Sequence, residues 1–285
     1  MYDNLESKKF NVESGKLRSC ADIEKILITK FRKKAWTPFF KAVKEYNLIQ
    51  AGDSIAAAIS GGKDSLVTAK LLQEIQRHGD VQFDLKFIFM DPGYTPENLQ
   101  ILKDNCEHLG LQIHIEKRNI FDRLNGKQTK YPCYLCARMR RGALYSMAKS
   151  LSCNKVALGH HFDDVIETIL LNILCSGKYQ TMMPKLKSNN FDNMELIRPS
   201  YYVREDNISE IISWSGINVI NCGCSLTSDE APGKRAEIKT LIKTLGLTFK
   251  DVDKCIYQST RNVYIDAIIE WVDGSDRINF LDKYF

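Results

Sequence analysis

The sequence lacks the features that mark membrane and secreted proteins. No apolar run approaches the roughly 20 residues that cross a bilayer, and the polar N-terminal stretch contains no signal-peptide core. We therefore expect a cytoplasmic protein with no membrane partner. Internal repeats and low-complexity linkers are also lacking. The 285 residues are 44% hydrophobic and 26% charged, the balance of a globular enzyme with one large α/β domain, alone or with a small appendage.

The two common glycine signatures of nucleotide binding are missing as well, since neither G-x-x-x-x-G-K-[ST] nor G-x-G-x-x-G occurs. A glycine pair, Gly61 and Gly62, nevertheless stands between the apolar run 54–60 and a helical pattern that begins at Ser65. This order of strand, tight turn and helix N-terminus suits phosphate, because backbone N–H groups and the helix dipole favour an anion. Asp64 would repel phosphate unless it holds Mg²⁺, so we expect a phosphate loop that works with that ion.

Strand and helix patterns alternate along the rest of the chain. Apolar, strand-like segments occur at 54–60, 84–90, 111–116, 155–159 and 194–199. Helical patterns separate them, which predicts a five-stranded parallel sheet with helices on both faces and ligands at the carboxyl ends of its strands.

The segments before and after these alternating strands and helices are expected to be mostly helical. Pro38 interrupts a helical pattern over 22–47, which predicts two helices or one kinked helix. Near the C-terminus, a short strand at 217–220 and helices at 232–245 and 258–272 are predicted. We therefore expect three parts: an N-terminal arm with helices at 1–47, a catalytic domain at 48–225 and a C-terminal helical extension at 226–285.

A second group of polar residues follows the fourth strand pattern. Gly159 ends that strand, and Asp163 and Asp164 open the next helix. Carboxylates are favoured at a helix N-terminus, so we expect Asp163 to cap the helix and Asp164 to face Mg²⁺ or the nucleotide. His160 and His161 have no third histidine or cysteine at short range, so packing against the nucleotide is a better interpretation than zinc binding.

Nine cysteines are many for a chain in a reducing compartment, where structural disulfides are rare. Four of them form close pairs, Cys133/Cys136 and Cys222/Cys224. The pairs could build a structural zinc site, a redox dithiol, or an iron–sulfur cluster with three thiolate ligands. We favour the cluster, because C-x-C fits poorly around one tetrahedral ion. A cubane with three protein ligands also leaves one iron open to sulfide or a substrate atom.

The loop Ser60–Ser65 resembles the SGGxDS loop of the PP-loop ATP pyrophosphatases, which cleave ATP between the α- and β-phosphates and convert a carbonyl oxygen into its AMP ester. Downstream stand "CYLCARMRRGALY", "KVALGHHFDDVIETILLNIL", "MMPKL" and "LIRPSYYVRE". In this order they make the chain similar to the TtcA family, the tRNA 2-thiocytidine synthetases, over about residues 40 to 245. C-x-x-C followed by R-x-R-R and GHHxDD distinguishes this group from lysidine synthetases and simple amidotransferases.

The resemblance implies insertion of sulfur at C2 of a cytidine in the tRNA anticodon loop, dependent on ATP and Mg²⁺, with a 4Fe-4S cluster held by three cysteines. Cys133 and Cys136 match two ligands. The third is Cys224 or Cys222, since the spacing of this pair departs from the family's. Arg140 falls where the wider thiolation group keeps a basic residue near the α-phosphate, and with Asp64 and Asp164 it completes the expected catalytic set. Contacts to ATP are expected from Ala58, Ser60, Gly61, Gly62, Lys63, Asp64, Ser65, Met90, Gly159 and Asp164.

Binding of tRNA requires basic surface, and the net charge of +5 permits such a partner without demanding it. The candidate residues are 30–34, Arg138, Arg140, Arg141, Lys178, Lys185 and Lys187. We expect a homodimer, with a cysteine desulfurase or free sulfide as the sulfur donor. Two alternatives stay open: the same chemistry on another base or a small molecule, and a zinc-stabilised ATP-binding module without catalysis.

Overall fold

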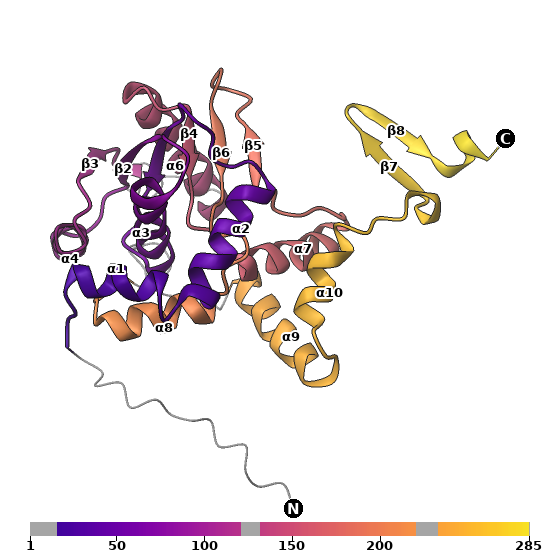
Figure 1. Ribbon diagram of the computed structural model, residues 1–285. Helices are drawn as coiled ribbons and strands as arrows, with labels where there is room; N and C mark the ends of the chain where they lie inside the picture. The colour runs from indigo at the N-terminus through magenta and orange to yellow at the C-terminus, as the bar shows by residue number, and fades with distance from the viewer. Residues whose placement is uncertain (1–15, 121–131, 221–232, 285) are drawn as a thin grey trace, which may run out of the picture. The chain divides into compact units, whose positions relative to one another are not determined.

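The computed structural model describes residues 16–120, 132–220 and 233–284 and divides into two compact units (Figure 1). The first unit lies within Met1–Asp164 and Met183–Ala231, and the second within Val165–Met182 and Pro232–Phe285. Every helix in the described part of the chain is too short or too polar to cross a bilayer.

A six-stranded sheet in the order β3-β2-β1-β4-β6-β5 forms the centre of the first unit. The strands are β1 Ser54–Ala58, β2 Asp84–Asp91, β3 Ile113–Lys117, β4 Lys155–Ala157, β5 Lys185–Lys187 and β6 Glu195–Ile197. All pairs are parallel except β5 with β6. Strand order reverses between β1 and β4, which makes their carboxyl ends the switch point at which open α/β sheets bind ligands.

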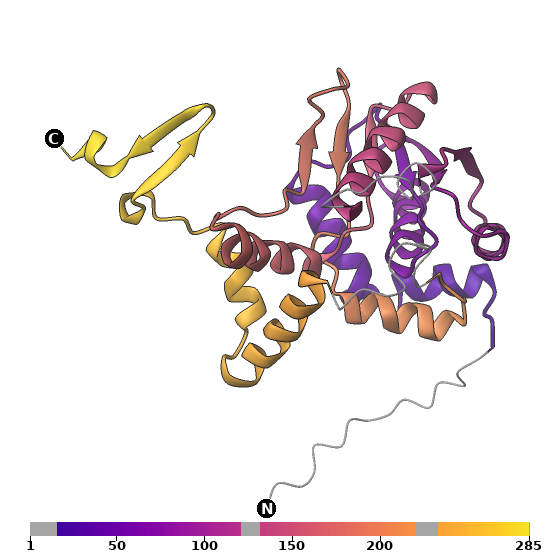
Figure 2. The same ribbon diagram turned by 180° about the vertical axis from the view of Figure 1, so that it is seen from behind.

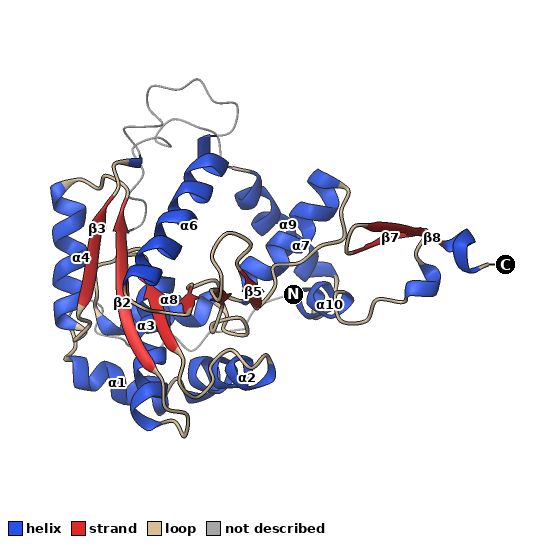
Figure 3. Ribbon diagram, turned by 90° about the horizontal axis from the view of Figure 1, so that it is seen from above, coloured by secondary structure: helices blue, strands red, loops and turns tan. Residues whose placement is uncertain are grey.

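Different helices bury the two faces of this sheet (Figure 3). Alternate residues of each strand face opposite ways: Ile55 and Ala57 join one apolar cluster, and Ala56 and Ile88 join the other. The second cluster is covered by α6, Pro132–Ser150. The first is covered by α1 Cys20–Ile28, α2 Thr37–Glu45, α3 Lys63–His78, α4 Pro96–His108 and α8 Glu205–Ser215. Burial on both faces is typical of a parallel sheet.

The sheet has six strands, so the predicted number of five is wrong. The additional strand β5 lies antiparallel beside β6 at the edge of the sheet (Figure 2). It consists of only three residues, Lys-Leu-Lys, and a short charged edge strand carries almost no apolar pattern. The short strand predicted at 217–220 does not form. There the Ile220 N–H donates to the Gly61 carbonyl at 3.1 Å, and the Asn218 carbonyl accepts from the Asn105 side chain at 2.8 Å.

The N-terminal helical pattern forms two helices, α1 and α2, separated by a π-helical turn at Arg32–Trp36. Of the two predicted arrangements, two helices or one kinked helix, the first is the one that forms. Pro38 stands in the first turn of α2, where its missing N–H has no intrahelical partner to lose.

In the second unit, α9 Lys234–Thr248 and α10 Val252–Ser259 follow the larger part of α7, Phe162–Ser176. Arg235 of α9 pairs with the buried Glu167 of α7 at 3.5 Å. The helix predicted over 258–272 is wrong, because α10 ends at Ser259 and β7 Glu270–Asp273 pairs with β8 Asp276–Asn279. Gly274, at φ +63°, makes the connecting turn, and Asp-Gly is a typical hairpin signal.

Candidate active site

A cavity of about 390 Å³ lies at the switch point of the sheet. It is formed where β1, β2 and β4 end, with one wall from α6. Eight of the residues predicted to contact ATP or to take part in catalysis line it: Ala58, Ser60, Asp64, Ser65, Met90, Arg140, Gly159 and Asp164. The structure therefore brings the glycine loop, the segment after β4 and the helix of the first cysteine pair to one place.

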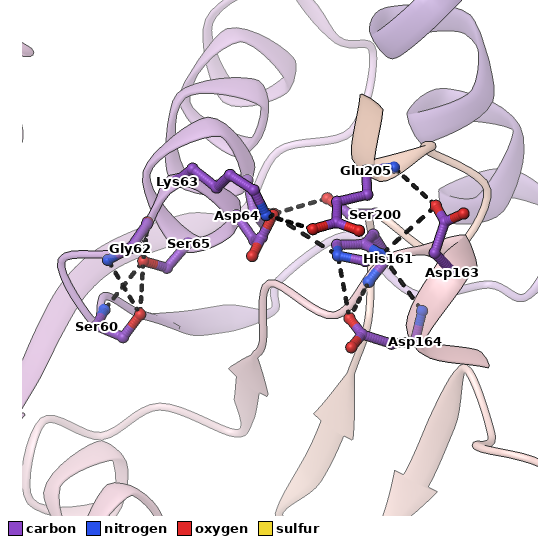
Figure 4. A network of polar contacts seen from close by, with 11 residues as sticks. Ser60, Gly62, Lys63, Asp64, Ser65, His161, Asp163, Asp164, Ser200 and Glu205 are labelled. Atoms are coloured by element: carbon purple, nitrogen blue, oxygen red, sulfur yellow. Dashed lines mark hydrogen bonds and ion pairs between the residues drawn. The ribbon is translucent and has the colours of Figure 1, made fainter. Parts of the chain in front are cut away.

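The loop Ser60–Ser65 is held in shape by its own serines (Figure 4). The Ser65 hydroxyl accepts from the Ser60 N–H at 3.0 Å and donates to the Gly62 carbonyl at 2.9 Å. Gly61 has φ +82°, a backbone conformation that side chains disfavour. No side chain caps the N-terminus of α3, so its first-turn N–H groups are available to an anion.

Gly159 lies against this loop so closely that no side chain fits between them. A Cβ atom at Gly159 would stand 2.9 Å from the Asp64 carbonyl carbon and 2.9 Å from the Ser65 nitrogen. The absence of a side chain thus allows the end of β4 to touch the start of α3. Close backbone approach of this kind shapes a cradle for a ligand.

His161 and Asp164 cap the start of α7 reciprocally. The His161 N–H donates to Asp164 Oδ2 at 3.0 Å, and His161 Nδ1 accepts from the Asp164 N–H at 3.3 Å. In the tautomer that accepts this bond, Nε2 carries the proton, and it lies 3.5 Å from Asp164 Oδ2 and 3.7 Å from Asp64 Oδ1. The imidazole therefore sits between two carboxylates that belong to different elements (Figure 4).

Asp163 does not cap α7 in the way predicted. Its carboxylate accepts from the Glu205 N–H at 2.7 Å and pairs with Arg204 at 3.1 Å, so it stabilises the start of α8 instead. The sequence could not reveal this contact, because the partners are 42 residues apart.

Lys63 contacts two carboxylates. Its Nζ lies 2.9 Å from Asp64 Oδ1 and 3.1 Å from Glu205 Oε1. Partial burial works against the charge, but the hydrogen bonds and charges of Asp64 and Glu205 outweigh it and raise the pKa of Lys63. Gly61, Gly62 and Lys63 are not among the described residues that line the cavity. Glu205 is a site residue that the sequence reasoning missed, although it ends the quoted stretch "LIRPSYYVRE".

Cys136 is a buried cysteine of α6 that packs with Met90 and Ile120, and Met90 in turn lines the cavity. The side chain of Cys133, and all of Cys222 and Cys224, lie outside the described residues, so the predicted ligand set stays a prediction. Within the described part of the chain, no three histidine, cysteine or acidic side chains are grouped to hold a metal ion.

The basic residues fall into two classes. Lys30 and Lys34 contact side chains of their own surface: Lys30 lies over the Trp214 ring, and Lys34 forms an ion pair with Glu210. By contrast, Arg140 lines the cavity, and neither Arg140 nor the nearby Arg138 and Arg141 form an ion pair with a described residue. The cavity lining also includes His160, for which packing against the nucleotide was predicted, and Arg141, a predicted RNA contact. The apolar Ile59, Ala137, Leu144 and Leu158 line it too, and the sequence did not identify them.

Three comparisons with known proteins bear on this site. A family model described as a PP-loop domain matches residues 33–222. The tRNA-cytidine(32) 2-sulfurtransferase of Pelobacter propionicus is 36% identical over 227 residues, which are 79% of this chain and 83% of the relative. The enzyme of the same name from Shewanella pealeana is 36% identical over 75% of this chain and 69% of its own length. The U34-tRNA thiolase NcsA of Methanococcus maripaludis, solved with its [4Fe-4S] cluster, superposes with a TM-score of 0.63 at 21% identity, over 80% of this chain and 79% of that one, a likeness of fold.

Proposed function

From the premise that the chain belongs to the PP-loop family and, within it, to the tRNA-cytidine(32) 2-sulfurtransferases, we propose a reaction. The resemblance to the TtcA family indicates the same membership. The enzyme activates the C2 oxygen of an anticodon-loop cytidine with ATP and replaces that oxygen with sulfur. One observation carries the proposal: the glycine loop, the Asp64 and Asp164 carboxylates and the cysteine-bearing helix α6 border one cavity.

ATP is the substrate that this cavity suits. Its phosphates would lie on the loop Ser60–Ser65, where the uncapped N-terminus of α3 offers N–H groups. Met90 is the candidate contact for the adenine ring.

Two carboxylates of this site would hold Mg²⁺. Asp64 and Asp164 come from different elements but approach the same imidazole nitrogen, so their oxygens converge on one region. Mg²⁺ is commonly bound by one or two carboxylates together with phosphate oxygens and water, and Asp64 and Asp164 provide that donor set. When bound, the ion neutralises phosphate charge beside Asp64.

The cytidine reacts in two displacements. First, its C2 oxygen attacks the α-phosphorus, and the bond to the β-phosphate oxygen breaks to release pyrophosphate. Arg140 and the loop N–H groups stabilise the charge that develops on the phosphoryl oxygens. Second, sulfur bonds to C2 and the C2–O bond breaks, so AMP leaves with the former base oxygen. Holding base and ATP in line is the main contribution of the protein.

Two cysteines of α6 support the proposal of a 4Fe-4S cluster beside this cavity. Cys136 is buried and adjacent in sequence to Ala137 of the cavity wall, and Cys133 lies one helical turn before it in α6. With Cys224 or Cys222 as the third ligand, such a cluster would supply the place from which sulfur is delivered. The relative NcsA carries a [4Fe-4S] cluster, which supports the assignment. A cysteine desulfurase or free sulfide would supply the sulfur to a homodimer of this chain.

The test is thiolation by the purified protein. Anaerobically prepared enzyme is incubated with unmodified tRNA transcript, ATP, Mg²⁺ and sulfide, and the digested nucleosides are analysed by mass spectrometry. We expect 2-thiocytidine that requires ATP, with iron in the protein. Thiolation of another base or of a small molecule would redirect the proposal, and colourless protein with stoichiometric zinc and no product would refute it.

A further inference from the structure

A second cavity, of about 370 Å³, lies along α6 beside the first. It shares Ala137 and Arg141 with the first cavity, so the two are neighbours along one helix. The proposed ATP chemistry uses none of its other lining residues. Its walls come from α6 and from the loop between β5 and β6.

Two aromatic rings form one wall of this cavity. Tyr145 of α6 and Phe191 of the loop have ring centroids 5.4 Å apart with planes inclined by 38°. Tyr145 is buried and fixed by the apolar cluster under α6, and Phe191 packs against the same cluster while remaining partly accessible. A rigid aromatic pair that still offers accessible surface is suited to stacking a flat ring, and every nucleobase presents one.

Positive charge surrounds the aromatic pair. Arg138 and Arg141 line the cavity, are exposed, and form no ion pair with a described residue, and none of the described lining residues is acidic. Arg198 is 7% exposed, and its Nε has no hydrogen-bond partner among the described residues. Burial lowers the pKa of Arg198 to about 10, so it remains charged at neutral pH and adds to the field near Arg141 and Tyr145.

We infer that this second cavity binds a nucleotide of an unpaired RNA strand, with the base against Tyr145 and Phe191 and the phosphate near Arg138 and Arg141. The inference rests on the proposed function, and it identifies where the RNA is held. Duplex RNA keeps its bases stacked inside the helix, whereas a loop nucleotide can place its base on an aromatic side chain. Because Arg141 borders both cavities, the bound loop is presented to the ATP site.

The experiment measures RNA binding without thiolation, by fluorescence anisotropy. The probe is a labelled stem–loop RNA with a seven-nucleotide loop, and a fully paired duplex of equal length serves as its comparison. Loss of one stacked base contact costs roughly 1–3 kcal/mol, so Phe191→Ala should weaken stem–loop binding by roughly 5- to 150-fold. Phe191→Trp, which keeps a stacking surface, should retain binding.

A second pair of variants tests the inference without changing the loop between β5 and β6, which carries Phe191. Arg138 is exposed on α6, so Arg138→Gln should leave the fold intact, weaken binding and lower the slope of log K against log salt by about one. Lys103→Gln, which removes an exposed charge from α4 away from both cavities, is the matched control and should change neither quantity. Affinity for a non-hydrolysable ATP analogue should be unchanged in Phe191→Ala and Arg138→Gln.

Wild-type affinity in both Phe191→Ala and Arg138→Gln would overturn the inference, and so would equal binding of the duplex and the stem–loop. Either result would leave the proposed function standing, since thiolation by the wild-type enzyme is measured separately. A wild-type protein that binds no RNA would overturn both.

Discussion

Gly159 offers the sharpest test of how the site is built. Substitution by alanine would place a Cβ 2.9 Å from two backbone atoms of the loop and 3.0 Å from the Asp64 carbonyl oxygen. Ordinary contacts of a Cβ atom begin near 3.4 Å, so Gly159→Ala forces a displacement of about half an ångström. Neither the end of β4 nor the start of α3 can shift easily. β4 is paired between β1 and β6, and the clashing atoms of α3 belong to its backbone.

Two effects should follow in Gly159→Ala. Overpacking of a well-packed region costs about 1–3 kcal/mol, which denaturant unfolding can measure. A misplacement of one ångström at a reacting centre can cost about 100-fold, so half that displacement should lower the rate of pyrophosphate release about tenfold. The second effect depends on the loop holding ATP, whereas the first does not.

Gly246→Ala is the matched control for Gly159→Ala. Gly246 lies inside α9, is exposed, and an added Cβ would have only Val252 within reach, at 4.0 Å. We expect equal or slightly higher stability, since alanine is favoured over glycine in a helix by up to about 1 kcal/mol, and an unchanged rate. Unaltered stability and pyrophosphate release in Gly159→Ala would refute the close fit of β4 against the phosphate loop.

Three further predictions concern single side chains. Asp64→Asn should reduce ATP-dependent pyrophosphate release by at least about 100-fold with an unchanged circular dichroism spectrum, and normal release would remove Asp64 from the magnesium site. Arg140→Ala should lower kcat about 100-fold with little change in KM, because it acts on charge that develops in the transition state; a change in KM alone would mean ground-state binding only. Burial acts to raise the pKa of Glu24, but hydrogen bonds from Lys70 and Arg77 outweigh it and lower that pKa from its usual 4.5 to about 2. The carboxylate therefore contributes up to about 3 kcal/mol above pH 4.5 that is lost as pH falls toward 2, and Glu24→Gln should flatten this acid limb in urea titrations; an unchanged limb would contradict the ion pair.

The sequence predicted the elements whose signals are local. The parallel strands β1, β2, β3, β4 and β6 have apolar runs bounded by turn residues, and α4 ends beside Gly110 at φ +65°, where a glycine is expected. The glycine loop and the start of α7 were predictable because each is a short motif placed directly after a strand.

Other features could not be predicted because they depend on contacts between residues that are far apart in the sequence. The segment 217–220 has strand-like residues, but its backbone is hydrogen-bonded to the glycine loop and to α4 instead of a neighbouring strand. Glu205 reaches Lys63 across 142 positions, and no local pattern encodes such a contact. The contact of His161 Nδ1 with the Asp164 N–H at the start of α7 was not predicted either. The hairpin after α10 was not predicted because each of its strands has four residues and little apolar pattern.

The central claim is that the cytidine C2 oxygen becomes an oxygen of AMP. It is tested most directly with a tRNA whose target cytidine carries ¹⁸O at C2, incubated with the enzyme, ATP, Mg²⁺ and sulfide, followed by mass spectrometry of the released AMP. We expect one ¹⁸O atom in AMP for each sulfur atom incorporated and none in pyrophosphate. Thiolated tRNA accompanied by unlabelled AMP would contradict the claim.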